Sequence, residues 1–94
     1  MPRSPFEWDA IKAKINKQKH GVSFEEAATV FDDPLAAIFD DEIHSVYEAR
    51  EIIIGQSINQ RLVLVCFTER AGSIRIISAR RATPRESHDY ESGS

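Results

Sequence analysis

Residues 51–81, EIIIGQSINQRLVLVCFTERAGSIRIISARR, decide the fold of this chain. Within this stretch, three apolar runs are rich in the β-branched and bulky residues that favour strands. The runs lie at 51–56, 62–67 and 74–79. Short polar segments join them, so the sequence predicts three antiparallel strands in a meander. The run at 62–67 is continuously apolar, which is typical of a strand covered on both faces.

The residues before this stretch predict two helices, the first at 9–20. Asp9 can cap this helix, and Gly21 can end it in the left-handed conformation that glycine adopts easily. Ile11 and Ile15 lie four residues apart, which places them on one face of the helix.

The second predicted helix covers 24–31. Ser23 and Glu26 match a capping box, in which each side chain satisfies a backbone donor at the start of a helix. Pro34 ends the helix, because the residue before a proline avoids the helical region.

Two further short strands are predicted outside the meander. Residues 6–8 alternate apolar and polar side chains, and residues 35–39 form a short apolar run. Residues 43–49 are compatible with either a loop or a helical turn.

A second capping box, formed by Thr83 and Glu86, predicts a final helix at 84–91. The order of elements therefore predicts one α+β domain over residues 1–94. We expect two N-terminal helices packed on a small antiparallel sheet, with a short C-terminal helix.

The composition is that of an ordinary globular domain, with 94 residues, 41% hydrophobic and 29% charged. The single cysteine, Cys66, excludes an internal disulfide and a cysteine-rich zinc cluster, and we expect it to be a small buried side chain. No apolar run is long enough to span a membrane, and the N-terminus lacks the hydrophobic stretch of a secretory signal. We therefore expect a cytoplasmic protein without membrane contact.

Charge is unevenly distributed, although the net charge is only −3. Residues 1–21 carry a net charge of +3, residues 22–60 carry −8 and residues 61–88 carry +4. Two basic blocks thus flank an acidic middle. The two blocks can form one phosphate-binding face, or they can pair with the acidic middle and neutralise it.

Arginines dominate the second basic block, and their planar, permanently charged guanidinium groups suit phosphate oxygens. For any single arginine, an ion pair with a carboxylate is the alternative to a phosphate contact. For the group, we expect at least two to face a phosphate. Regular alternation along the last strand places Arg75 and Arg80 on opposite faces.

The candidate titrating groups are His20, His44 and His88. Their wide spacing gives no metal-binding pair, so we expect no metal and no cofactor. His20 can instead cap the first helix, and His88 can be an ordinary surface side chain. Tyr90 can anchor the final helix to the sheet.

Five segments of the chain resemble the BrnT toxin family. They are FEWD at 6–9, KHGVSFEEA at 19–27, VFDDP at 30–34, TER at 68–70 and IRIISARRA at 74–82. The resemblance implies a RelE-like fold and a ribonuclease toxin of a bacterial type II toxin–antitoxin system. It also implies a BrnA-type antitoxin, a toxin dimer within the assembly, and operator DNA contacts made mainly by the antitoxin.

The basic blocks and the resemblance together suggest a metal-independent endoribonuclease. The expected catalytic residues are Lys19, His20, Arg70, Arg75, Arg80, His88 and Tyr90, and the expected additional RNA contacts are Arg61, Arg81 and Arg85. The arginines would stabilise charge on the phosphorane. Lys19 and His20 would bind phosphate and transfer a proton, and His88 or Tyr90 would supply the second proton role.

The tail suggests an alternative function. Ser87 and Asp89 stand where family members tend to have basic residues, so the chain can also be an inactive relative that binds the antitoxin and regulates transcription. The antitoxin is expected to cover the arginines with carboxylates. Alternatively, it grips the acidic middle with basic residues.

Overall fold

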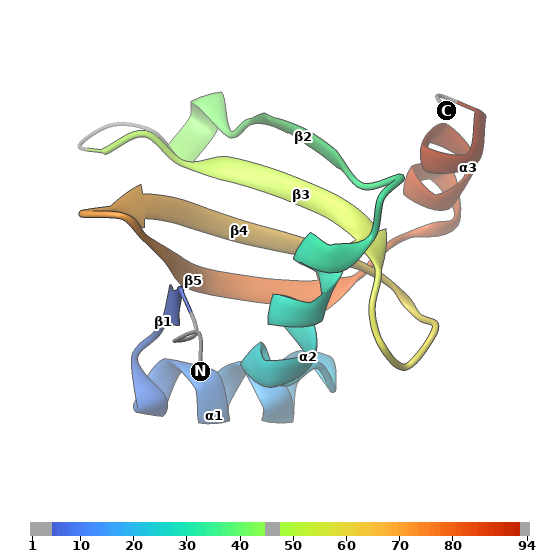
Figure 1. Cartoon of the computed structure of the whole chain (residues 1–94). Helices are drawn as coiled ribbons and strands as arrows, with labels where there is room; N and C mark the ends of the chain where they lie inside the picture. The colour runs from blue at the N-terminus through green and yellow to red at the C-terminus, as the bar shows by residue number, and fades with distance from the viewer. Residues whose placement is uncertain (1–4, 45–47, 93–94) are drawn as a thin grey trace.

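The computed structural model describes residues 5–44 and 48–92, and within these ranges a single five-stranded sheet is flanked by helices (Figure 1). The elements in chain order are β1 (Phe6–Glu7), α1 (Ala10–His20), α2 (Phe24–Thr29), the 3₁₀ turn η1 (Val30–Asp32), β2 (Ala37–Asp40), the 3₁₀ turn η2 (Glu42–His44), β3 (Glu51–Gln56), β4 (Leu62–Arg70), β5 (Ser73–Arg81) and α3 (Pro84–Ser92). Helices α1 and α2 lie on the same side of the sheet. The α+β prediction is confirmed. Part of the ambiguous segment at 43–49 lies outside the described residues.

The sheet is mixed, with the strand order β1-β5-β4-β3-β2. The meander from β2 to β5 is antiparallel, but β1 pairs parallel with β5. The expectation of an entirely antiparallel sheet is therefore wrong at one edge. A parallel pair needs a long connection between its strands, and here the connection is most of the chain, which no local pattern reveals.

Helix α1 begins and ends at the predicted caps. Asp9 accepts hydrogen bonds from the backbone of the first turn, and Gly21 has φ 72° and donates its N–H to Lys17 O. Its inward residue is not an isoleucine, however, because Ile11 is 72% exposed and Ile15 is 55% exposed. The buried side chain of α1 is Asn16.

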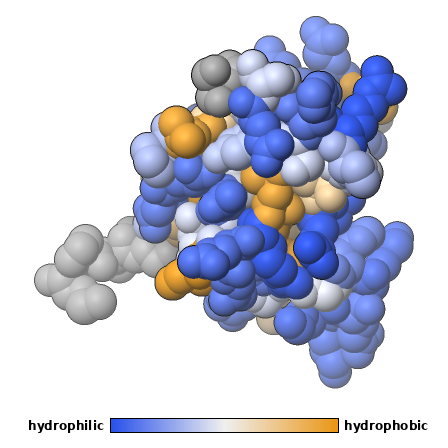
Figure 2. Space-filling model, turned by 90° about the vertical axis from the view of Figure 1, so that its right-hand side faces the viewer, coloured by the Kyte–Doolittle hydropathy of each residue, from blue (hydrophilic) through white to orange (hydrophobic). Residues whose placement is uncertain are grey.

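The core lies between the sheet and α1–α2. Its buried residues are Val22, Phe24, Ala27, Val30, Ile53, Val63, Val65, Phe67, Ile76 and Ala79. Phe31 extends this cluster through ring contacts with Phe6 and Phe67, at centroid distances of 5.2 and 4.9 Å. On the side of the molecule shown in Figure 2 the surface is mainly hydrophilic, and apolar residues form small separate patches.

Strand β5 contains a β-bulge at Ile77. Cys66 pairs with Ser78 while the next residue, Phe67, pairs with Ile76, so Ile77 is an extra residue without a cross-strand partner. A bulge shifts the alternation of the strand by one position.

The bulge changes which side chains share a face of the sheet. Arg75 and Arg80 lie opposite Thr68 and Leu64 on the side away from α1 and α2. The prediction that Arg75 and Arg80 lie on opposite faces is therefore wrong, because it assumed an unbroken strand.

The helix α3 begins with the predicted capping box. The backbone N–H of Thr83 donates to Glu86 Oε1, at 2.8 Å, and the backbone N–H of Glu86 donates to Thr83 Oγ1, at 3.2 Å. None of the helices in the described ranges is long and apolar enough to cross a membrane.

Candidate nucleic-acid interface

The sheet side away from α1 and α2, here called the open face, collects three of the expected catalytic arginines. Its members on β4 and β5 are Leu64, Cys66, Thr68, Arg70, Ser73, Arg75, Ser78 and Arg80. The three arginines come from the ends of the two longest strands. Their convergence on one side depends on the bulge at Ile77.

Arg80 marks the end of the open face next to α3. Its Nη1 and Nη2 donate to the two carboxylate oxygens of Glu86, each at 2.8 Å, and Nη1 also donates to Arg81 O. This pairing lowers the pKa of Glu86 to about 2, with the Arg80 hydrogen bonds as the largest cause. Because a guanidinium has five N–H donors, Arg80 keeps donors for a further anion.

Arg70 and Arg75 mark the other end, near the turn between β4 and β5. Arg70 forms an ion pair with Glu48 at 2.9 Å, and Arg75 forms one with Glu7 at 3.2 Å. The pKa of Glu48 is lowered, mainly by the hydrogen bond from Arg70, and the charges of Arg50 and Arg75 contribute. Arginines from different parts of the chain thus act on the carboxylate of Glu48.

The two ends are too far apart to hold a single phosphate. At about 3.3 Å per residue, Arg75 and Arg80 lie roughly 15 Å apart along β5. A single phosphate cannot contact both guanidinium groups in their present pairs. An extended chain carrying several phosphates can contact both.

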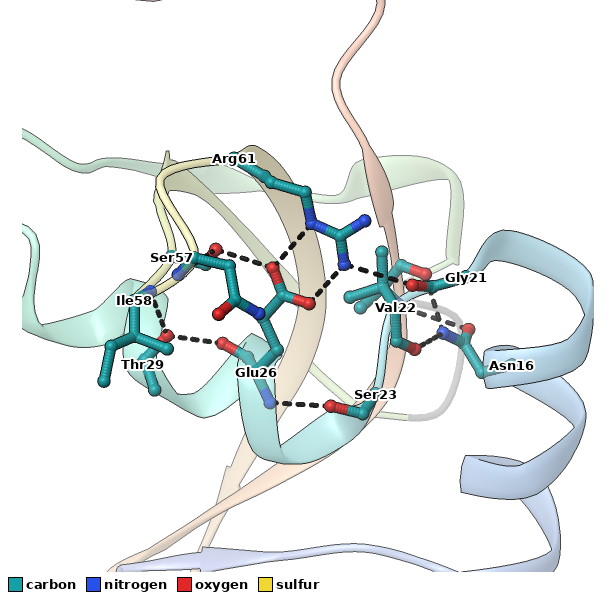
Figure 3. Close-up of polar contacts among 11 residues, drawn as sticks. Asn16, Gly21, Val22, Ser23, Glu26, Thr29, Ser57, Ile58 and Arg61 are labelled. Atoms are coloured by element: carbon teal, nitrogen blue, oxygen red, sulfur yellow. Dashed lines mark hydrogen bonds and ion pairs between the residues drawn. The ribbon is translucent and has the colours of Figure 1, made fainter.

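Arg61 lies elsewhere, in a polar network that joins α2 to the loop between β3 and β4 (Figure 3). It donates to both carboxylate oxygens of Glu26 and to Gly21 O. Ser57 also donates to Glu26, at 2.6 Å, and Glu26 is only 6% exposed. The expected RNA contact at Arg61 is thus engaged in holding the fold together.

Arg81 and Arg85 are exposed. Arg81 pairs with Val63 and therefore lies on the sheet side that α1 and α2 cover, whereas Arg85 lies in the first turn of α3. Neither side chain forms an ion pair with another residue in the described ranges.

Lys19 and His20 do not lie on the open face. They line a groove of about 220 Å³ between α1 and β5, together with Lys12, Ile77 and Ser78. Ser78 also belongs to the open face, so the groove and the open face adjoin along β5. The two basic blocks therefore meet at one strand, but from opposite sides of the sheet.

The remaining expected proton-transfer residues lie on α3. His88 is exposed. The hydroxyl of Tyr90 donates to Asp33 Oδ2 at 2.6 Å, and burial together with this carboxylate raises the pKa of Tyr90 to about 12. Tyr90 and Glu86 also line a second groove, of about 230 Å³, beside β2 and β3.

Sequence reasoning gave ion pairs as the alternative for single arginines but did not identify the carboxylates that accompany them. Glu7, Glu48 and Glu86 each pair with one arginine of the open face. Glu86 was detectable as a capping residue, but its bond to Arg80 required knowing where the strand ends. Glu7 and Glu48 lie far from their partners in sequence and carried no local signal.

Cys66 lies on the open face between the two arginine ends and is partly buried. Burial, together with the nearby carboxylate of Asp41, raises the pKa of its thiol to about 11. Such a thiol is a poor nucleophile at neutral pH. Within residues 5–44 and 48–92, no group of three or more His, Cys, Asp and Glu side chains is placed to hold a metal ion.

Comparisons with known proteins agree with the resemblance seen in the sequence. Residues 8–86 match the model of a family described as the ribonuclease toxin BrnT of type II toxin–antitoxin systems. Among solved structures, the fold is similar to that of the Brucella abortus ribonuclease toxin BrnT, with a TM-score of 0.65 and 23% sequence identity. That match covers 83% of this chain and 95% of the Brucella chain. No curated protein sequence is significantly similar to this chain.

Proposed function

The chain belongs to the BrnT family of ribonuclease toxins of type II toxin–antitoxin systems, and we propose that it is an endoribonuclease that binds RNA on its open face. The observation that carries this proposal is the row of Arg70, Arg75 and Arg80 on one side of the sheet. We further propose that the fold is RelE-like and that the toxin works in the cytoplasm.

Two phosphate contacts at different points of one RNA strand fit this row. Arg70 and Arg75 would hold one phosphate near the β4–β5 turn, and Arg80 would hold another beside α3. The paired glutamates keep the guanidinium groups in place before RNA binds, which lowers the ordering cost of binding.

The proposed reaction needs no metal ion. The 2′-OH oxygen of a nucleotide attacks the adjacent phosphorus, the bond from phosphorus to the 5′ oxygen breaks, and a 2′,3′-cyclic phosphate and a 5′-OH result. One protein group accepts the 2′-OH proton and another delivers a proton to the leaving oxygen. Arg80, next to α3, stabilises the charge on the phosphorane, and Arg70 and Arg75 hold a neighbouring phosphate of the same strand.

The groups proposed for proton transfer approach from two sides. Lys19 and His20 lie in the groove along β5, and His88 and Tyr90 lie on α3, whose Glu86 binds Arg80. Arg81 and Arg85 are proposed to contact RNA outside the reacting phosphate, because both guanidinium groups are exposed. Arg61 is the weakest of the proposed RNA contacts, since Glu26 already holds it.

The test is an RNA cleavage assay in the presence of a chelator, both with naked RNA and in an extract that contains ribosomes. We expect Arg80→Ala to lower the rate by roughly 10²–10³, as for the loss of one charge-stabilising donor, and Arg75→Ala mainly to weaken RNA binding. Lys14→Ala, which removes an exposed charge on α1, is the matched control and should cleave normally. Intact RNA under every condition, from a folded protein, would contradict the proposal.

A second candidate function is favoured by the ion pairs themselves. Because each of the three arginines already has a carboxylate partner, the chain can be an inactive relative that binds an antitoxin and regulates transcription. Expression in a bacterium separates the two. Growth arrest that Arg80→Ala relieves supports the enzyme, and harmless expression supports the regulator.

The partners follow from the same family. We propose that a BrnA-type antitoxin neutralises the chain, that a toxin dimer forms within the complex, and that the antitoxin makes the contacts with operator DNA. Co-purification of the two proteins, followed by measurement of the mass of the complex with and without operator DNA, tests these assignments together.

A further inference from the structure

The two edges of the sheet differ in how their backbone groups are covered. At the β5 edge, β1 pairs with Ile74 and Arg75. Beyond β1, the side-chain amide of Asn16 donates to Ala79 O at 2.8 Å and accepts from Ala79 N at 3.1 Å. Asn16 thus replaces one residue of a missing strand, and such a cover prevents pairing with another chain.

The β2 edge has no comparable cover among the described residues. Figure 1 shows β2 at the rim of the sheet, and all four of its residues are exposed. Asp41 N donates to Arg50 O across the β2–β3 ladder. Because alternate residues point the same way, the backbone groups of Ile38 and Asp40 point away from β3.

Apolar side chains accompany these backbone groups. Ile38 is 55% exposed, Phe39 is 48% exposed and Ile43, just after the strand, is 83% exposed. Ile38 and Phe39 lie on opposite sides of β2, so an added strand would contact apolar surface on both of its faces. Phe39 also lines the groove beside Tyr90.

The charge around the β2 edge indicates which kind of partner can bind there. Three acidic residues without an ion pair to another described residue lie on or beside this edge: Asp40 on β2, Glu51 opposite it on β3, and Glu42 in η2. A second copy of the chain, pairing β2 with β2, would bring these like charges together, which is destabilising. A basic segment would be attracted, whereas RNA would be repelled.

We propose that β2 is the docking edge for the antitoxin, whose occupying segment is an extended strand with basic and apolar residues; this rests on the proposed function. The segment adds to the sheet as a strand next to β2. Its backbone pairs with Ile38 and Asp40, its basic side chains meet the acidic residues, and its apolar side chains cover Ile38 and Phe39. An acidic segment is less well matched to this edge, because Asp40, Glu42 and Glu51 would repel it.

Hydrogen exchange on the purified toxin with the antitoxin encoded beside it tests the backbone pairing. We expect the amides of Ile38 and Asp40 to exchange at least about tenfold more slowly in the complex, since they become ladder hydrogen bonds. If these amides exchange as in the free toxin while the complex is intact, the proposal is wrong.

Charge variants test the chemistry of the partner. Asp40→Lys combined with Glu42→Lys should weaken antitoxin affinity at least about tenfold, mainly through loss of charge complementarity. Ile11→Lys, which adds a positive charge at an exposed position on α1, is the control and should bind normally. Circular dichroism confirms that both variants fold.

The same variants separate this proposal from the proposed function. RNA cleavage by the edge variant without antitoxin should be normal. If no variant cleaves RNA, the proposed endoribonuclease activity is contradicted, but antitoxin binding at β2 can still be measured. Protection of Ile38 in a dimer of the free toxin, or loss of RNA cleavage in the edge variant, would overturn the proposal in favour of a second copy or of RNA.

Discussion

At the scale of single residues, Glu26 and Arg61 are the clearest example of a charge pair committed to structure. Glu26 is nearly buried, and Arg61 and Ser57 both donate to its carboxylate. The bonds connect α2 with the loop after β3 and with the end of α1, as Figure 3 shows. Removing one partner would leave a buried charge without compensation.

We expect Arg61→Ala to lower the free energy of unfolding by about 3 kcal/mol, at the lower end of the range for breaking a buried pair, because Arg61 is itself partly exposed. Urea denaturation measures this change. Arg85→Ala, which removes an exposed arginine, should change stability by less than about 0.5 kcal/mol. Equal effects of the two substitutions would contradict the structural role of Arg61.

The same pair predicts how stability depends on pH. The hydrogen bonds from Arg61 lower the pKa of Glu26 from 4.5 to about 2, so the folded state binds the proton less readily than the unfolded state. The resulting stabilisation is fully present above the unfolded pKa and is lost as the pH falls through the folded pKa. We expect unfolding free energy to fall between about pH 5 and pH 2.

Denaturation of Glu26→Gln across this range is the measurement. The variant should show a shallower dependence than the natural chain, with part of the slope retained because Glu86 has a similarly lowered pKa. An identical slope in the two proteins would assign the acid sensitivity to other carboxylates.

At the scale of elements, β3 passes very close to η1 and to the segment that follows it. A Cβ at Gly55 would lie 2.9 Å from Ala36 Cβ, 3.0 Å from Asp33 Oδ2 and 3.2 Å from Val30 Cγ1. Real Cβ atoms do not approach other atoms as closely as 2.9 Å, so either the strand or the segment around Ala36 must shift. Gly55 therefore sets the distance between these elements.

We expect Gly55→Ala to lower the free energy of unfolding by about 1–3 kcal/mol, because overpacking forces backbone movement. Thermal unfolding monitored by circular dichroism gives the value. The control is an alanine substitution at the exposed Gln18 of α1, which should be nearly neutral. An unchanged melting temperature for Gly55→Ala would show that the backbone near Gly55 moves without loss of stability, which would contradict the prediction.

The elements also show how far a sequence determines a fold. The β-branched run at 51–56 and the two capping boxes predicted β3 and the starts of α2 and α3 correctly, because each depends on neighbouring residues. The bulge at Ile77 was not predictable, since it depends on which residue of β4 lies opposite. The burial of Asn16 rather than Ile15 likewise depends on the exposed backbone of β5.

In the candidate site, too, features that depend on residue type were predictable, and features that depend on the tertiary arrangement were not. Residue types that suit phosphate were visible in the sequence, and Arg70, Arg75 and Arg80 do lie on one face. Their carboxylate partners, in contrast, come from β1, α3 and the segment before β3. Such pairs are set by the tertiary arrangement.

At the scale of the whole molecule, positive and negative surfaces are separated across the sheet. The open-face arginines lie on β4 and β5, and Asp40, Glu42 and Glu51 lie on or beside β2. With a net charge of −3, the chain has little attraction for RNA away from its arginines.

We therefore expect a modest salt dependence of RNA binding. The two phosphate contacts proposed for the arginine row give a slope of about −1.4 for the logarithm of the affinity against the logarithm of salt concentration, since each contact to a single strand contributes about −0.7. Arg80→Ala, which removes the single arginine of one contact, should reduce the slope to about −0.7. Fluorescence anisotropy with a short RNA at several salt concentrations measures it, and a slope near −5 would mean that the lysines of α1 also bind.

The cover that Asn16 provides has a consequence for stoichiometry. A sheet grows into a filament only when every subunit offers two open edges, one to receive and one to give. The described sheet has one open edge, at β2, so it can accept one added strand. Once a partner strand occupies this edge, no further strand can be added to the sheet. Raising the partner concentration therefore increases the occupancy of the edge but does not produce a longer assembly.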